Sequence, residues 1–167
     1  ARFVEGARPW EVAVDIAIPS ATQNELDEDD ARALIAGGVR AVSEGANMPS
    51  TPGAVAAFQQ AGVLFGPGKA ANAGGVATSA LEMSQNASRQ RWSFDDSEQK
   101  LRDIIADIHH AAFEAAERYG HGGDYVVGAN IAGFERVAHA MLAATTVDRT
   151  ADGGALLPSY RDALTRP

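Results

Sequence analysis

The stretch GVLFGPGKAANAGGVATSALEM, residues 62–83, places several glycines around a single lysine directly after a short apolar run. Within it, Gly66–Ala71 fits the G-x-G-x-x-[GA] spacing of a dinucleotide-binding turn. Pro67 argues against that turn because it stiffens the position between the two glycines, and no acidic residue ends a following strand. A Walker-type phosphate loop is excluded, because Val63 and Ala70 stand where it needs a glycine and a magnesium-binding hydroxyl.

Around this stretch, short apolar runs alternate with helical patterns. Three runs are predicted as strands, at residues 12–18, 39–42 and 63–65. Two helices are predicted between the strands and three longer ones after them, at residues 27–36, 51–61, 74–91, 97–119 and 129–145. The alternation indicates a parallel sheet with crossover helices, but three strands are few for such a sheet. We therefore predict an α/β fold: the second half of a Rossmann-like, doubly wound parallel sheet, followed by long carboxyl-terminal helices.

The composition excludes several classes of protein. The chain has 167 residues, 46% of them hydrophobic, which is enough for one domain with a buried core. It contains no cysteine, so no disulfide framework is expected and a reducing cytoplasm is the default location. Its net charge of -8 argues against nucleic-acid binding. No long apolar stretch and no basic leader followed by an apolar run is present, so neither membrane insertion nor export is expected.

Each predicted strand runs into a polar or glycine-rich stretch, and ligands of open α/β sheets bind beyond the carboxyl ends of the strands. Asn47 follows the second strand and Asn72 follows the third. A side-chain carboxamide offers a donor and an acceptor, as the carboxamide of nicotinamide does. Two alternatives remain open at this point: Asn47 is a turn residue before Met48-Pro49, and the glycines of residues 62–83 serve tight packing.

Other patterns favour structural roles. His109 and His110 are adjacent on a predicted helix and point about 100° apart, so they do not share a metal ion unaided. His110 and Glu114 have i, i+4 spacing, which is more often a packed or surface pair. Residues 129–134 form either a second cofactor loop or a helix contact through small side chains. Lys69 is interpreted as a solvated loop charge. No metal site is predicted.

Five segments of the chain closely resemble the hexameric, bacterial-type glutamate dehydrogenases, in particular their NADP-linked branch. The segments are DIAIPSATQNEL, AVSEGANMPST, FQQAGVLFGPGKAANAGGVATSALEMSQN, DIHHA and YVVGANIAGFERVAHAML. The resemblance implies that the chain is the carboxyl-terminal half of such an enzyme. It implies a partial dinucleotide-binding domain at residues 1–70 and a helical segment at residues 71–147 that packs back on the substrate side. Residues 148–167, with glycine, proline and scattered charge, are predicted as a loosely held tail.

The resemblance also implies roles for six residues: Ala21 and Thr22 beside the cofactor, Asn47 and Asn72 near the nicotinamide and its ribose, and Val76 and Ser79 at the glutamate side chain. Ser79, at the opening of a helix, is expected to donate a hydrogen bond to the distal carboxylate, assisted by the helix end. Val76 is expected to pack against the methylenes. No catalytic residue is expected in this chain, because the family's catalytic lysine and aspartate lie upstream of the matched segments.

The implied activity is the reversible oxidative deamination of L-glutamate to 2-oxoglutarate and ammonia. NADP is the expected cofactor, and NAD stays open because the residue that reads the ribose 2′ position lies upstream. The full-length enzyme is expected to be a homo-oligomer. The isolated chain is expected to fold but to be inactive, because its two lysines, Lys69 and Lys100, do not supply the missing groups. The alternative is a truncated, non-catalytic module that binds a nucleotide or a partner.

Overall fold

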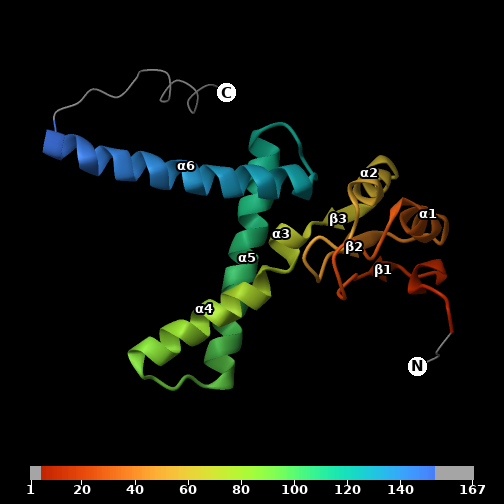
Figure 1. The fold of residues 1–167 in the computed structure, drawn as a ribbon, viewed down its shortest axis with the longest axis horizontal. Coiled ribbons are helices and arrows are strands. Elements are labelled where there is room, and N and C mark those ends of the chain that lie inside the picture. The colour runs from red at the N-terminus through yellow and green to blue at the C-terminus, as the bar shows by residue number, and fades with distance from the viewer. Residues whose placement is uncertain (1–4, 153–167) are drawn as a thin grey trace.

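The computed structural model describes residues 5–152, and its elements follow the predicted order (Figure 1). The sheet unit contains the 3-10 helix η1 (Pro9–Glu11), strands β1 (Ile16–Ala17), β2 (Ala41–Ser43) and β3 (Leu64–Gly66), and helices α1 (Glu28–Ala36) and α2 (Pro52–Gln60). The helical part contains α3 (Gly68–Ala71), α4 (Ala73–Ser88), α5 (Phe94–Arg118) and α6 (Tyr125–Asp152). The α/β class is therefore confirmed.

The three strands form one parallel sheet in the order β1-β2-β3. Side chains alternate between the two faces, so Ala17, Val42 and Phe65 are buried together on one face. On the opposite face, Ile16 is 60% exposed and Leu64 is 54% exposed. Fully parallel sheets are normally covered on both faces. The second face of this sheet is thus only partly covered by the described residues.

The main core lies between the sheet and the two crossover helices. Leu34 of α1 and Phe58 of α2 are buried against it, and the rings of Phe58 and Phe65 stack with centroids 5.9 Å apart. Leu26, at the end of the loop after β1, is fully buried in the same cluster. Burial of large apolar side chains of this kind contributes roughly 1.5–3 kcal/mol each. This core fixes the positions of the three strand ends.

Side-chain caps set where α1, α2 and α5 begin. Asp27 accepts from the backbone N–H of Asp30 at 3.0 Å and forms a capping box that starts α1. Thr51 caps α2, whose first residue is Pro52, as predicted. For α5 the predicted start at residue 97 is wrong. Ser93 forms a capping box with Asp96, so the helix begins at Phe94.

Strand β1 is shorter than the predicted 12–18 run. It is an edge strand with a single neighbour, and Val12 is 61% exposed. Apolar side chains alone do not make a strand where the backbone has no ladder partner. Helix α4 ends at Ser88 rather than at residue 91, because Arg89 adopts a left-handed conformation with φ of 53°.

Helix α6 begins at Tyr125, because the side chain of Asp124 accepts from the backbone N–H of Val126 at 2.9 Å. It continues to Asp152, past residue 148, where the tail was predicted to begin. Residues 153–167 lie outside the described part of the chain. Residues 129–134 are helical throughout, so they do not form a second cofactor loop.

Helices α5 and α6 cross closely. A Cβ built on Gly128 of α6 would lie 2.0 Å from the carbonyl oxygen of Ala112 on α5, so only glycine allows this approach. Ala116 of α5 is buried at the same crossing, 3.1 Å from a Cβ built on Gly128. The close contact is made by Gly128, one residue before the segment 129–134, and a Cβ built on Gly133 within that segment would meet nothing within 4 Å. The contact predicted for residues 129–134 themselves stays a prediction.

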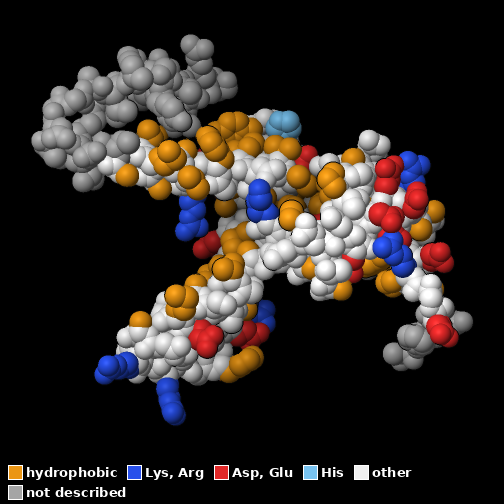
Figure 2. Space-filling view, viewed as in Figure 1, with side chains coloured by type: hydrophobic (Ala, Val, Ile, Leu, Met, Phe, Trp, Pro, Cys, Tyr) orange, Lys and Arg blue, Asp and Glu red, His pale blue; other side chains and the backbone are white. Residues whose placement is uncertain are grey.

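The helical part projects away from the sheet unit (Figure 1). Helices α4 and α5 form one arm and α6 forms another. Both arms carry hydrophobic side chains on their surfaces (Figure 2). The most exposed of these large side chains are Val76, Met83, Phe94 and Phe134.

Candidate functional site

A groove of about 580 Å³ lies at the carboxyl ends of the strands. Its lining comes from the loop after β1, the loop after β2 and the start of α4: Ser20, Ala21, Thr22, Gln23, Gly45, Ala46, Asn47, Asn72, Gly75 and Val76. Ligands of parallel α/β sheets bind at this edge. Five of the six predicted site residues line the groove, and only Ser79 does not.

Asn47 and Asn72 contact each other directly. Asn72 Nδ2 donates to Asn47 Oδ1 at 2.6 Å, although the two residues are 25 positions apart in the sequence. The bond leaves the Oδ1 of Asn72 and the Nδ2 of Asn47 without a partner from this pair, so an acceptor and a donor stay available to a ligand.

The first two loops are joined by the backbone. Gly45 N–H donates to the carbonyl of Pro19 at 2.8 Å, and Ala46 N–H donates to the same oxygen at 3.2 Å. A Cβ built on Gly45 would lie 2.2 Å from Ser20 Oγ, so a side chain at this position would force the Ser20 hydroxyl to rotate away. The loop after β1 is held in turn by Glu25, whose Oε1 accepts from Ala21 N–H at 2.8 Å.

Glu44 joins the second loop to the third, and the sequence analysis did not identify it. Glu44 is buried, with only 6% of its surface exposed to solvent. Oε1 accepts from Ser50 N–H at 3.1 Å, and Oε2 accepts from Gly68 N–H at 2.6 Å. The sequence did contain a signal for it, an acidic residue directly after a predicted buried strand. A carboxylate that is buried at such a position requires hydrogen-bond partners, so it indicates a structural link.

Two glycines of residues 62–83, Gly66 and Gly68, serve tight packing, which is the alternative that the sequence left open. A Cβ on Gly68 would lie 2.9 Å from the carbonyl oxygen of Ala46, and one on Gly66 would lie 3.3 Å from Ser43 Oγ. These two glycines therefore pack against β2 and the loop that follows it rather than against a ligand. Because the Gly68 amide is already bonded to Glu44, the stretch is no phosphate cradle. Gly75 alone among the glycines of residues 62–83 lines the groove.

Val76 and Ser79 lie on α4, three residues apart, so they share one face of the helix. Val76 is 72% exposed at the groove. Ser79 does not stand at the helix opening as predicted. The helix begins at Ala73, so Ser79 is in the second turn, where the end charge has largely decayed. Its hydroxyl donates to the carbonyl of Gly75 at 3.3 Å.

The two lysines lie outside the groove lining. Lys69 donates from Nζ to Asn130 Oδ1 on α6, so it is not the free loop charge that the sequence suggested. Lys100 lies over the ring of Trp92, 5.1 Å from its centroid. His109 is hydrogen-bonded to the hydroxyl of Tyr125 at 3.1 Å. Among residues 5–152, no group of three or more histidine, cysteine or acidic side chains is arranged to hold a metal ion.

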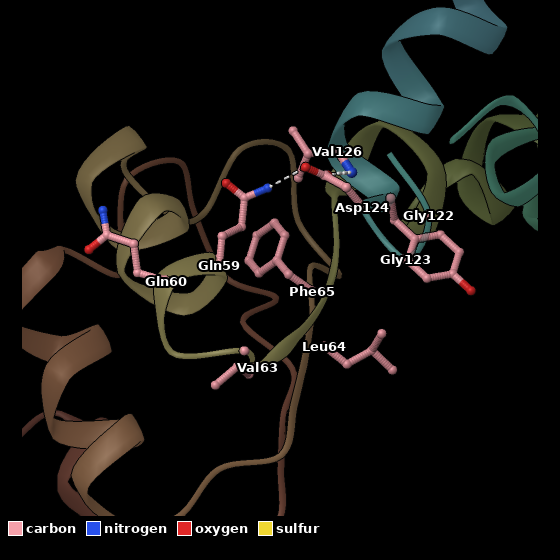
Figure 3. Close-up of a pocket in the computed structure, with 11 residues that line it drawn as sticks. Gln59, Gln60, Val63, Leu64, Phe65, Gly122, Gly123, Asp124 and Val126 are labelled. Carbon is pink, nitrogen blue, oxygen red and sulfur yellow. Dashed lines mark hydrogen bonds between the residues drawn. The ribbon is translucent and has the colours of Figure 1, made fainter. Parts of the chain in front are cut away.

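A second hollow, of about 560 Å³, lies between α2, β3 and the turn before α6 (Figure 3). Gln59 Nε2 donates to Asp124 Oδ2 across it at 3.1 Å. Gly62 and Val63, which precede β3, line its floor together with Gly122 and Gly123. This hollow is at the amino end of β3, on the opposite side from the edge where ligands of such sheets bind.

Most of the chain matches one known protein family. The family model described as Glutamate/Leucine/Phenylalanine/Valine dehydrogenase matches residues 1–144. This chain belongs to that family. The resemblance to glutamate dehydrogenases is thereby confirmed.

The chain is similar to several proteins that are named glutamate dehydrogenases. The NADP-specific glutamate dehydrogenase of Escherichia coli is 60% identical over 146 residues, which are 84% of this chain and 31% of that protein. The NAD(P)-specific glutamate dehydrogenase of Xylanibacter ruminicola is 53% identical over 146 residues, 85% of this chain and 32% of that protein. The crystal structure of Plasmodium falciparum glutamate dehydrogenase matches with a TM-score of 0.78 and 45% identity, covering 81% of this chain and 29% of that one.

The chain thus spans about a third of the length of the relatives it matches. In the part of this dehydrogenase-family chain that the structure describes, no helix combines the length and apolar character needed to cross a membrane.

Proposed function

We propose that this chain forms the carboxyl-terminal part of an NADP-linked glutamate dehydrogenase and contributes one wall of its cofactor and substrate site. The reaction is the reversible oxidative deamination of L-glutamate to 2-oxoglutarate and ammonia. The observation that carries the proposal is the groove in which Asn47 and Asn72 are hydrogen-bonded to each other. Family membership and the NADP-specific relatives support it.

The groove fits the nicotinamide end of the cofactor. Its volume of about 580 Å³ is within the usual range of roughly 300–1,000 Å³ for ligand sites. The free amide atoms of Asn47 and Asn72 match the donor and acceptor of the nicotinamide carboxamide. Ala21 and Thr22 place a small side chain and a hydroxyl on the opposite loop. When bound, the nicotinamide accepts the hydride that leaves the substrate carbon.

The substrate side chain is assigned to α4. Val76 is exposed at the groove and offers an apolar surface to the methylenes of glutamate. The Ser79 hydroxyl makes only a 3.3 Å bond within its own helix, and rotation of its side chain frees it to donate to the distal carboxylate. These contacts position one end of the substrate. Proton transfer is assigned to groups outside this chain, since neither lysine lines the groove.

We also propose NADP as the preferred cofactor, homo-oligomeric assembly and a cytoplasmic location. The NADP-specific relatives favour NADP, although one relative is named NAD(P)-specific. Exposed apolar side chains on both helical arms support assembly with further protein surface. The sequence offers no disulfide framework of the kind that oxidising compartments favour.

An exchange experiment tests the proposed function. The matching segment of the E. coli relative is replaced by this chain, and glutamate-dependent reduction of NADP⁺ is measured for the hybrid and for the isolated chain. We expect activity in the hybrid and none in the isolated chain. A folded hybrid without activity would instead favour the second candidate, a non-catalytic module. That candidate is supported by the lack of any lysine in the groove lining.

A further inference from the structure

We propose that Glu44 is a positioning residue that sets the geometry of the Asn47–Asn72 pair without contacting the ligand. The inference rests on the proposed function for its ligand, but its structural part stands on the geometry of this chain alone. Glu44 is the last residue before the loop that carries Asn47, and it directly follows β2. Its carboxylate bonds two backbone amides that belong to different parts of the site.

The first contact shapes the loop that carries Asn47. Glu44 Oε1 accepts from Ser50 N–H at 3.1 Å, so the carboxylate joins the residue before this loop to Ser50 at the loop's far end. Met48, inside the loop, adopts a left-handed conformation with φ of 48°. That conformation costs a residue with a side chain about 1–2 kcal/mol and persists only where surrounding contacts enforce it. The Glu44–Ser50 bond is such a contact.

The second contact fixes the start of the loop that carries Asn72. Glu44 Oε2 accepts from Gly68 N–H at 2.6 Å, a short bond of the charge-assisted kind. Gly68 packs so closely against Ala46 and Glu44 that a Cβ there would lie 2.9 Å from the Ala46 carbonyl oxygen. Asn72 accompanies Gly68 as a rigid unit, because Asn72 N–H donates to the Gly68 carbonyl at 3.1 Å through α3.

The two loops therefore meet through two side-chain links, Glu44 to Gly68 and Asn72 to Asn47. The first is buried, and the second lies at the exposed groove. A buried, charge-assisted bond persists better than a bond between two amides that face water. Glu44 consequently holds the two asparagines within reach of each other, and the ligand finds their free amide atoms already in place.

Glu44→Gln tests this role in the full chain. Glutamine has the same shape but only one acceptor oxygen, so either Ser50 N–H or Gly68 N–H loses its partner. We expect faster hydrogen exchange at one of these amides and a shifted side-chain amide signal of Asn72 in NMR spectra. We also expect an NADPH dissociation constant raised at least about fivefold. Glu98→Gln is the matched control, because Glu98 pairs with Arg102 on the surface of α5.

A double-mutant cycle separates positioning from general support of the fold. In the Asn72→Ala background, Glu44→Gln should weaken NADPH binding much less than in the native chain. An undiminished effect there, or unchanged Asn72 signals and NADPH affinity in folded Glu44→Gln, would overturn the inference. If Glu44→Gln does not fold, Gly68→Ala is judged by the same readouts, because it separates the loops and leaves the carboxylate intact.

The NMR measurement distinguishes failure of the proposed cofactor site from failure of the positioning role of Glu44. If the native chain binds no NADPH, the proposed cofactor site fails, whereas the positioning role of Glu44 is still decided by the Asn72 amide signal. If the native chain binds NADPH and Glu44→Gln changes neither readout, only the positioning role fails.

Discussion

Asn72 and Asn47, which follow two different strands, are joined by a 2.6 Å hydrogen bond between Nδ2 and Oδ1. The bond brings the ends of β2 and β3 together at the groove. It also orients both carboxamides, so that each presents one free polar atom. The proposed recognition of nicotinamide depends on this arrangement.

Replacement of either asparagine should weaken cofactor binding. Asn47→Ala or Asn72→Ala leaves the other amide without its partner, and each change should remove roughly 1–3 kcal/mol of binding free energy. In the hybrid enzyme this corresponds to a rise in KM for NADP⁺ of about 5- to 150-fold, with a lower kcat. Asn86→Ala, near the exposed end of α4, is the control. Unchanged kinetics in both site variants would refute the assignment of the groove.

Ser79 should affect glutamate and not the cofactor. Ser79→Ala removes the donor proposed for the distal carboxylate, and we expect KM for glutamate to rise roughly fivefold or more in the hybrid. KM for NADP⁺ should stay constant. Thr78→Ala is a close control, since Thr78 also donates within α4, to the carbonyl of Gly74 at 2.9 Å. Equal effects of the two substitutions would show that Ser79 acts only through the helix.

Two glycines of α6 should respond in opposite ways to the same substitution. Gly128→Ala places a methyl group 2.0 Å from the Ala112 carbonyl oxygen and should destabilise the chain by about 1–3 kcal/mol or more. Gly133→Ala meets nothing within 4 Å and should stabilise it by about 0.5–1 kcal/mol through higher helix propensity. Urea unfolding measures both values. Similar effects at the two positions would contradict the close crossing of α5 and α6.

The lowered pKa of Asp27 predicts that the stability of the fold decreases at acidic pH. The backbone N–H of Asp30 and the guanidinium of Arg8 lower the pKa of Asp27 below its ordinary 3.8. A lowered folded-state pKa stabilises the fold above the unfolded pKa, and this stabilisation disappears as the pH falls through the folded value. Asp27→Asn retains the cap but does not titrate. The native chain should therefore be more stable than this variant near neutral pH, and the difference in Tm should shrink as the pH falls below the ordinary carboxyl pKa of 3.8. A difference independent of pH would contradict this.

Much of the fold could be predicted because local patterns determine it. The alternation of apolar runs and helical segments predicted the sheet, and Thr51-Pro52 predicted the start of α2. The start of α5 was missed because the box formed by Ser93 and Asp96 overrides the apolar pattern that begins later. The length of β1 was missed because strand pairing depends on a neighbour, which its own sequence does not reveal.

The candidate site was predicted mainly through the family resemblance, and its geometry was not. The bond from Glu44 to Gly68 joins residues 24 positions apart, and no local spacing rule reports such a contact. The same limit applies to Gly68. A side chain at this position would clash with the carbonyl oxygen of Ala46 on another loop, which no local pattern reports. For Ser79, the helix start was predicted to within one residue, but Ser79 was treated as part of the helix opening although it lies in the second turn, and the helix-end effect is confined to the first turn.

Glutamate-dependent reduction of NADP⁺ by the isolated chain and by the hybrid with the E. coli relative tests the central claim most directly. We predict that the hybrid reduces NADP⁺, that Asn72→Ala lowers its kcat, and that the isolated chain shows no turnover. The reason is that hydride transfer needs an enforced approach of the two reacting carbons, which one wall of a cleft does not provide. Turnover by the isolated chain that is abolished by Ser79→Ala would contradict the account, because a complete site would then lie within these 167 residues.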